Sequence, residues 1–386
     1  MRAGYGDKLR GFLSQQSRLR QLIDFGDLPV FQGVAAYPLI VIANKQRPQI
    51  QAPHTVQTLT ATTVDCLQDL EAYIETNAHR IPSSQLGSSE WQFAADGGSL
   101  QAKIAIKSTP LKTVVDGKIY YGIKTGFNKA FVIDEATRIR LIAEDPKAAE
   151  VIKPYLEGED IGRYQVIDPK KYVILIPKGW TNQNRGKSEA EQFISRELTG
   201  IYQHLQKTEE LRRYGKIKAK GRGLYHRDDQ GDYWWELRAC AYYPDFEKPK
   251  ITWGNLATKA SFAFDDQAFF VNAPACIIPI DDLCLLALMN SQVSSFSLLK
   301  DAAERQNGYF EQKPVYVEKL PIPNLNDGQK AHLAEWAQRL MDLHKEVDTP
   351  TRQNNIAELE RNINQLLYAF YDLTPDEIAT IEGAGQ

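Results

Sequence analysis

The sequence predicts a mixed α/β (α+β) fold in more than one unit, and three observations indicate this. The chain has 386 residues, of which 43% are apolar, so it can bury at least one full core and its length fits two or three units. Strand-like and helix-like runs are mixed along most of the chain. Its end holds two long helical patterns.

Charge and cysteine usage narrow the class of protein. A net charge of -3 argues against a uniformly basic surface, so any contact with a polyanion must come from a local patch. The four cysteines lie far apart without a C-x-x-C pair, which indicates neither a zinc site nor a disulfide framework. No apolar run reaches the roughly 20 residues of a membrane helix, and the N-terminus lacks a signal-peptide core. We therefore expect a reduced, cytoplasmic protein with no membrane partner.

The first hundred residues divide into two parts. Residues 8–17 are amphipathic, and residues 19–25 and 34–43 are strand-like. One helix and two strands cannot close a core alone, so we expect them to join a sheet supplied by the rest of this chain or by polypeptide outside it. Residues 46–101 contain several prolines, a helical run over 63–77 and a Ser/Gly-rich gap, which predict a linker with one helix.

The middle of the chain is typical of an antiparallel or mixed sheet with helices. Helices are expected over 188–212, with Ser188 as a candidate cap, and over 283–299. Pro321 and Pro323 predict an extended linker that ends this domain. The strands are expected at residues 172–176, 250–253, 260–264, 268–271 and 275–278.

The end of the chain is acidic. Residues 327–386 hold eleven Asp or Glu against five Lys or Arg, with helical segments over 329–347 and 353–371. We expect a solvated helical cap that packs by one face.

Residues 119–134 form the first candidate for function. Two β-prone runs, 119–123 and 130–133, flank a polar middle with three residues typical of turns, which predicts a hairpin with a wide, exposed turn. This turn presents cations and hydrogen-bonding groups, and the alternative is a solvated hairpin whose lysines only maintain solubility. The candidate contacts are Lys124, Thr125, Asn128 and Lys129.

A cationic run, residues 212–227, is the second candidate. Its seven cations stand among sixteen residues without one acid, so they repel one another unless the run is solvated or neutralised by a polyanion. Glycines permit close backbone approach, and neighbouring rings supply flat faces. The candidate nucleic-acid contacts are Arg212, Arg213, Lys216, Lys218, Lys220, Arg222, Tyr225, His226 and Arg227.

Several aromatic residues follow the cationic run. Trp234, Trp235 and Trp253 could form a base-stacking platform, although aromatic residues at strand spacing mostly fill a core. The nearby phenylalanines are expected in the core. Trp253 is kept as a candidate DNA contact.

The 119–134 stretch closely resembles the opening signature of the TaqI-like C-terminal specificity domain. This domain is the target-recognition part of adenine-specific DNA methyltransferases in type IIG restriction-modification enzymes and related phage-defence methylases. Other stretches resemble recurrent segments of the same family: Lys248–Trp253, Asn290–Ser291, Gly308–Phe310 and Tyr371–Thr374. Near the N-terminus, Leu9–Arg10, Asp24–Asp27, Val30–Phe31 and residues 37–45 look like the last elements of the methyltransferase domain.

The resemblance implies four parts. Residues 1–50 would be the C-terminal remnant of a Rossmann-like methyltransferase sheet, 51–100 a linker with a helix, 101–325 a mixed α/β target-recognition domain and 326–386 a helical tail. The family contacts double-stranded DNA with this domain, while a catalytic methyltransferase, with or without a nuclease, acts as its partner.

Catalytic motifs of the family are absent from the sequence. Adenine methyltransferases use an Asn-Pro-Pro-Tyr or Asn-Pro-Pro-Phe tetrapeptide and a glycine-rich loop for S-adenosylmethionine, and the chain contains neither. Asp168–Tyr172 lacks the second proline, and no histidine lies in a nucleophile context. We therefore expect no catalytic residue, metal or cofactor in this chain, with S-adenosylmethionine bound by the partner.

Two alternative functions remain open at this point. The chain could be an enzyme whose site forms between domains, or a protein-interaction scaffold, such as a subunit of a phage-defence complex, that contacts an acidic partner. Preference for one duplex sequence over a scrambled competitor would separate a scaffold from a DNA-recognition module.

Overall fold

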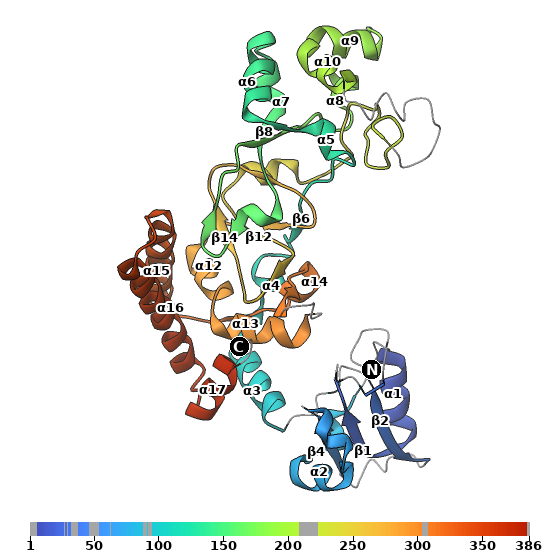
Figure 1. Ribbon diagram of the computed structural model, residues 1–386, viewed down its shortest axis with the longest axis vertical. Coiled ribbons are helices and arrows are strands. Elements are labelled where there is room, and N and C mark those ends of the chain that lie inside the picture. Colours follow the sequence, from blue (N-terminus) through green and yellow to red (C-terminus); the bar gives the residue numbers. More distant parts are fainter. Residues whose placement is uncertain are drawn as a thin grey trace. The chain divides into compact units, whose positions relative to one another are not determined.

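The computed structural model describes residues 6–26, 28, 30–31, 38–45, 54–61, 63–87, 91, 95–207, 223–302 and 308–383. The chain forms two compact units, Met1–Ile106 and Lys107–Gln386, which Figure 1 shows from blue to red along the sequence. The structure confirms a mixed α/β protein with several small sheets and a helical C-terminal end.

The first unit is built on one four-stranded sheet of order β2-β1-β3-β4. Strand β1 pairs antiparallel with β2 and parallel with β3, and β4 pairs antiparallel with β3. Neighbouring residues of β1 serve opposite faces, because side chains alternate along a strand: Leu22 packs with Val56 on one face and Ile23 with Leu59 on the other. The elements are α1 (Asp7–Gln16), β1 (Arg18–Asp24), β2 (Leu39–Asn44), β3 (Thr55–Thr60), η2 (Val64–Leu67), α2 (Leu70–Asn77), β4 (His79–Pro82), η3 (Ser83–Gln85) and α3 (Ala95–Ile106).

Part of the expected linker belongs to this sheet. Within the range 51–100, Thr55–Thr60 and His79–Pro82 are β3 and β4, so they are not linker. The strand β1, with which β3 pairs, lies more than thirty residues earlier in the chain, and no local sequence pattern predicts such a pairing. The expected helix over 63–77 is present as η2 followed by α2, which Asp69 caps. The expected strand over 34–43 is present where it is described, as β2.

The second unit contains two four-stranded sheets that share one large core. Their orders are β15-β8-β11-β7 and β14-β12-β16-β6. The first half of the unit consists of β5 (Ser108–Pro110), α4 (Leu111–Val114), β6 (Tyr120–Tyr121), α5 (Asn128–Phe131), β7 (Val132–Asp134), α6 (Glu135–Glu144), α7 (Ala148–Val151), β8 (Ile152–Leu156), η4 (Gly158–Asp160), β9 (Ile161–Gly162), β10 (Gln165–Val166), β11 (Lys171–Ile174), α8 (Trp180–Asn184), α9 (Ala190–Glu197) and α10 (Thr199–Lys207). The second half consists of η5 (Tyr243–Glu247), β12 (Lys250–Trp253), β13 (Leu256–Ala257), β14 (Ala263–Asp265), β15 (Phe270–Val271), β16 (Cys276–Ile278), α12 (Leu283–Met289), α13 (Gln292–Asp301), β17 (Phe310–Glu311), α14 (Pro314–Val317), β18 (Pro321–Pro323), α15 (Asp327–Lys345), α16 (Pro350–Phe370) and α17 (Pro375–Gly383).

The hairpin expected over 119–134 does not form. Strand β6 pairs with β16, whereas β7 pairs with β11 in the other sheet. Gly122 explains the divergence: its backbone lies so close to β15 that a Cβ would stand 2.4 Å from the carbonyl carbon of Asn272. This glycine serves a close approach of two chain segments, not a turn between paired strands.

Three other expectations need adjustment. Residues 321–323 are not a linker, because they form β18, which pairs antiparallel with β5. The helix expected over 283–299 is two helices, since Ser291 accepts a hydrogen bond from the Ser294 amide and starts α13. Ser188 is not the cap of α9, which begins after Glu189 without a side-chain cap.

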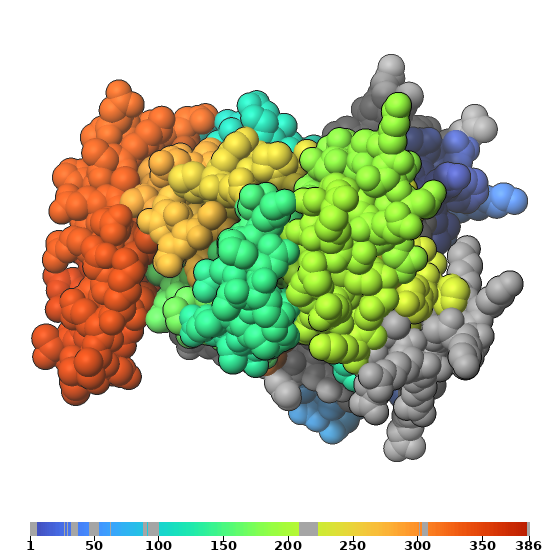
Figure 2. Space-filling model, turned by 90° about the horizontal axis from the view of Figure 1, so that it is seen from above, coloured from blue at the N-terminus to red at the C-terminus, as the bar shows by residue number. Residues whose placement is uncertain are grey.

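The helical tail consists of α15, α16 and α17. Leu333, Ala337 and Leu340 form the buried stripe of α15, which packs against α12. Figure 2 shows the tail, orange to red, beside the yellow and gold segments that precede it in the second unit. The expected cap that packs by one face is therefore confirmed.

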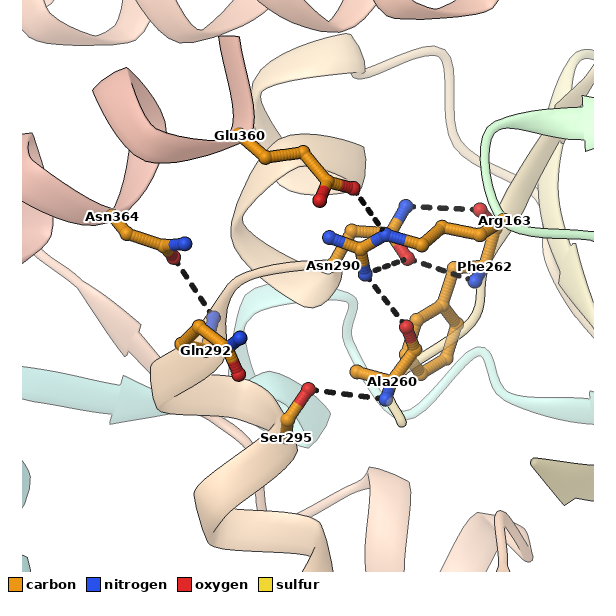
Figure 3. Close-up of polar contacts among 8 residues, drawn as sticks. All are labelled: Arg163, Ala260, Phe262, Asn290, Gln292, Ser295, Glu360 and Asn364. Carbon is orange, nitrogen blue, oxygen red and sulfur yellow. Dashed lines mark hydrogen bonds and ion pairs between the residues drawn. The ribbon is translucent and has the colours of Figure 1, made fainter. Parts of the chain in front are cut away.

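Arg163 joins the tail to the sheets (Figure 3). Its guanidinium donates to Glu360 of α16 at 2.6 Å, to the Ala260 carbonyl at 2.7 Å and to the Asn290 side chain at 3.3 Å. Asn290 is fully buried and binds both the amide and the carbonyl of Phe262. The Asn290–Ser291 segment thus has a structural role, because it ends α12 and binds the segment before β14.

Neutralising Glu360 should loosen the tail. Burial favours the neutral carboxyl, but the charge and hydrogen bond of Arg163 outweigh this effect and lower the pKa of Glu360 below its ordinary value of 4.5. We expect Glu360→Gln to lower the free energy of unfolding by about 2 kcal/mol at neutral pH, because Arg163 keeps its hydrogen bond and loses its counter-charge. Urea titration of the full chain would measure this.

The same group sets a pH dependence. A lowered carboxyl pKa stabilises the fold fully above the unfolded-state value, and this stabilisation is lost as the pH falls through the folded-state value. The wild-type chain should therefore lose more stability than the Glu360→Gln variant between about pH 5 and about pH 3.5. Glu358→Gln, an exposed position on the same helix, is the matched control. Equal losses in all three proteins would contradict the assigned role of Glu360.

Within the described ranges, no single helix is both long and apolar enough to cross a membrane. One pair, Leu283–Met289 with Gln292–Lys300, meets the length and composition requirements only together and is bent by 54°.

Candidate nucleic-acid interface

Residues 124–129, called the tip below, follow β6 and include the first two residues of α5, Asn128 and Lys129. The Thr125 hydroxyl accepts from the Phe127 amide at 3.1 Å and donates to Oδ1 of Asn128 at 2.5 Å. Gly126 has a positive φ of 69°, so the turn needs a residue that tolerates the left-handed region. These bonds hold Thr125 inside the turn, while Lys124, Asn128 and Lys129 are exposed.

Arg227 fastens the tip to a loop a hundred residues later in the sequence. Its guanidinium donates to the main-chain carbonyls of Thr125 at 2.9 Å, Leu224 at 2.8 Å, Trp234 at 2.5 Å and Glu236 at 2.5 Å. The same group lies 4.6 Å from the centre of the Phe131 ring. Arg227 is 2% exposed, and this burial lowers its pKa to about 10.

The loop that carries Arg227 is itself held by buried hydrogen bonds. The buried carboxylate of Glu236 accepts from the amides of Gly179, Thr181 and Asp232, at 2.9–3.1 Å, and so orders the start of α8. Gly231 passes directly over this carboxylate, since a Cβ there would lie 2.7 Å from the Oε2 atom of Glu236. The tip, α8 and the loop over 224–236 are therefore one connected unit. Figure 1 shows α5 beside this yellow-green loop.

Aromatic rings cover one side of the loop. The Tyr225 and Trp234 rings meet edge to face at 4.8 Å, and Trp234 and Trp235 meet in the same way at 5.3 Å. Trp235 is buried and donates its indole N–H to Thr181, so it belongs to the core. The half-buried rings border an open depression of about 480 Å³, which is lined by Tyr225, His226, Gln230, Asp232, Tyr233 and Trp234.

The predicted contact residues fall into three groups. Lys124, Asn128 and Lys129 are exposed on the tip, and Tyr225 and His226 are half-buried at the edge of the depression. Arg227 brings these two sets to one part of the molecule. The third group lies outside the described residues: Arg212, Arg213, Lys216, Lys218, Lys220 and Arg222.

Three predicted contacts are corrected by burial. Thr125 is 1% exposed and caps its own turn, and the guanidinium of Arg227 is directed at main-chain carbonyls and the Phe131 ring. Trp253 is fully buried, with its indole N–H bound to the Gln312 carbonyl at 2.7 Å. All three side chains are therefore buried and bind other parts of the chain itself.

Sequence reasoning missed several residues of this surface. Gln230, Asp232 and Tyr233 line the depression, and Glu236 orders it, yet nothing marked them beyond their closeness to the cationic run. The four acceptors of Arg227 likewise carry no sequence signal, since they are main-chain atoms.

No group of three or more His, Cys, Asp or Glu side chains is placed to hold a metal ion in the described parts of the chain. The four cysteines are free thiols, and burial raises the pKa of each.

Comparison with known proteins gives one family. Residues 153–322 match the family model described as the TaqI-like C-terminal specificity domain. This range includes the loop over 224–236 but not the tip. No curated protein matches the chain.

Two solved structures are among those that match the chain. The type IIL restriction-modification enzyme MmeI in complex with DNA is 11% identical with a TM-score of 0.50, and the match covers 96% of this chain and 45% of that one. The type IIG restriction endonuclease BpuSI is 12% identical with a TM-score of 0.38, covering 97% of this chain and 46% of that one. The chain thus spans less than half the length of either protein.

Proposed function

Because residues 153–322 belong to the TaqI-like C-terminal specificity domain family, we propose that the chain is the DNA-recognition module of a restriction-modification enzyme. In this proposal the module selects a site on double-stranded DNA, and a separate catalytic domain or subunit methylates adenine at N6 there. That catalytic part would bind S-adenosylmethionine. The chain itself would fix the position along the duplex at which the catalytic part acts.

The hydrogen bonds of Arg227 give the strongest support for this proposal. The bonds of Arg227 place the end of the cationic run next to the exposed cations of the tip, although the two segments lie about a hundred residues apart. A phosphate-contacting segment and a base-contacting segment must reach one duplex together, and this arrangement allows it. In our proposal the cationic run neutralises phosphates, while the tip approaches base edges in the major groove.

The proposal is tested by duplex binding at several salt concentrations. Each neutralised phosphate contributes about -0.9 to the slope of log K against log salt concentration. We expect the variant with Lys216→Ala, Lys218→Ala and Lys220→Ala to bind all duplexes more weakly and to reduce the steepness of this slope by roughly 2 to 3.

The matched control removes three exposed cations from α15, with Lys330→Ala, Arg339→Ala and Lys345→Ala. Its slope should equal that of the wild-type chain. An unchanged slope in the first variant would contradict the phosphate-binding role. Equal affinity of the wild-type chain for its preferred duplex and for a scrambled competitor would favour an interaction scaffold instead.

A further inference from the structure

The exposed side chains of the tip offer mainly hydrogen-bond donors. Residues 124–129 include no acid, and their exposed polar side chains are Lys124, Asn128 and Lys129. An ammonium group only donates, so two of the three can offer nothing but donors. The amide of Asn128 decides the character of the whole tip, because it carries both a donor and an acceptor.

The buried hydroxyl of Thr125 fixes the orientation of this amide. The hydroxyl oxygen accepts from the Phe127 amide, so its proton must find another acceptor inside the turn. Oδ1 of Asn128, at 2.5 Å, is the acceptor that the structure provides. Among the described residues, none accepts a hydrogen bond from Nδ2 of Asn128, which is therefore the atom available to a ligand.

Other contacts fix the position of the tip. Arg227 holds the carbonyl of Thr125, and Asp229 lies so close that a Cβ on Gly126 would stand 3.0 Å from its Cβ. The Asp229 carboxylate is paired with Arg238 at 3.1 Å. The tip is thus a preorganised turn that presents hydrogen-bond donors.

We propose that the tip reads a guanine edge in the major groove, with Nδ2 of Asn128 donating to guanine N7 beside the lysines. This inference rests on the proposed function. Guanine presents two adjacent acceptors there, N7 and O6, whereas cytosine presents the N4 donor, which a tip of donors rejects. The sequence preference would therefore include at least one guanine that depends on Asn128.

Phosphate oxygens also accept hydrogen bonds, so the experiment must distinguish a contact between Asn128 and a phosphate from a contact between Asn128 and a base. The full chain is used to select from a randomised duplex library, and the selected site is compared with those of Asn128→Asp and of Asn354→Asp. Asn128→Asp keeps the shape and the bond to Thr125 but offers only acceptors at neutral pH. Asn354→Asp adds the same charge at an exposed position of α16.

We expect the wild-type chain and Asn354→Asp to select the same site, with a dominant guanine at one position. Asn128→Asp should lose this guanine or replace it by cytosine, whose N4 group can donate to a carboxylate. A second measurement needs no variant: 7-deazaguanine at that position should weaken wild-type binding about tenfold.

Two results would overturn the inference. If Asn128→Asp weakens binding evenly and keeps every base preference, Asn128 contacts a phosphate. If 7-deazaguanine at each selected guanine leaves wild-type affinity unchanged, the tip does not read guanine N7. A wild-type chain that selects no site at all would instead overturn the proposed function, so the two failures are distinguishable.

Discussion

Arg227→Met should destabilise the second unit by about 4 kcal/mol. The sequence alone would predict a small effect, because Arg227 is the last of the seven cations in residues 212–227. Methionine fills a similar volume but removes a donor from four main-chain carbonyls; the Glu236 carbonyl keeps the Gly231 amide as a donor, whereas those of Thr125, Leu224 and Trp234 lose the donor that Arg227 supplies. Each buried acceptor left unpaired costs about 1–3 kcal/mol before relaxation, which reduces the sum. Urea unfolding followed by tryptophan fluorescence would report this loss, since five of the six tryptophans lie in this unit.

Arg238→Met provides the control for this prediction. Arg238 pairs with Asp229 at 3.1 Å on the surface, with half of its side chain exposed. Such pairs contribute up to about 1 kcal/mol. If Arg227→Met and Arg238→Met had similar effects, the bonds of Arg227 would not hold the loop.

The second large effect is expected at the buried pair of Lys250 and Asp265. Their side chains are 0% and 1% exposed, and the ammonium lies 2.5 Å from the carboxylate and 2.6 Å from the Phe246 carbonyl. Burial lowers the pKa of Lys250, and Asp265 opposes this only in part. Either Lys250→Met or Asp265→Asn should cost about 3–5 kcal/mol, because each leaves a buried charge without its counter-charge.

The double variant should cost less than the sum of the two single variants, since no unpaired charge remains. The neighbouring surface pair of Lys248 and Asp245, at 2.7 Å, supplies matched controls in Lys248→Met and Asp245→Asn. Both should stay within about 1 kcal/mol of the wild-type chain. Strictly additive losses at Lys250 and Asp265 would show that the pair is not coupled.

The local sequence pattern was sufficient to predict those elements that do not depend on a distant pairing partner. Strand β12 occupies the residues expected of it, and the two tail helices agree with expectation within a few residues, because period and composition specify them. The hairpin over 119–134 failed because glycines mark both turns and close approaches, and only the position of Asn272 decides between them. The strand at Pro321–Pro323 failed because proline suits an edge strand as well as a linker.

The same distinction applies to the candidate contact residues: the local pattern predicted exposure, but it did not predict burial by other segments. The exposure of Lys124 and Asn128 could be predicted because a polar segment between β-prone runs is exposed whichever way the strands pair. Arg227 was misjudged because its neighbours in sequence are cations, while its guanidinium is bound by the carbonyl of Thr125, about a hundred residues earlier, and by the carbonyls of Trp234 and Glu236 later in its own loop. Trp253 was misjudged because a tryptophan on a strand has the same pattern on a binding face and in a core.

Every acceptor that holds Arg227 is a peptide carbonyl, an atom that every residue carries whatever its side chain. Mutations that exchange the outward side chains on either segment would therefore leave this attachment intact. A lineage could acquire new recognition preferences on an unchanged framework, and a protein engineer could randomise positions 124, 128 and 129 with the same freedom.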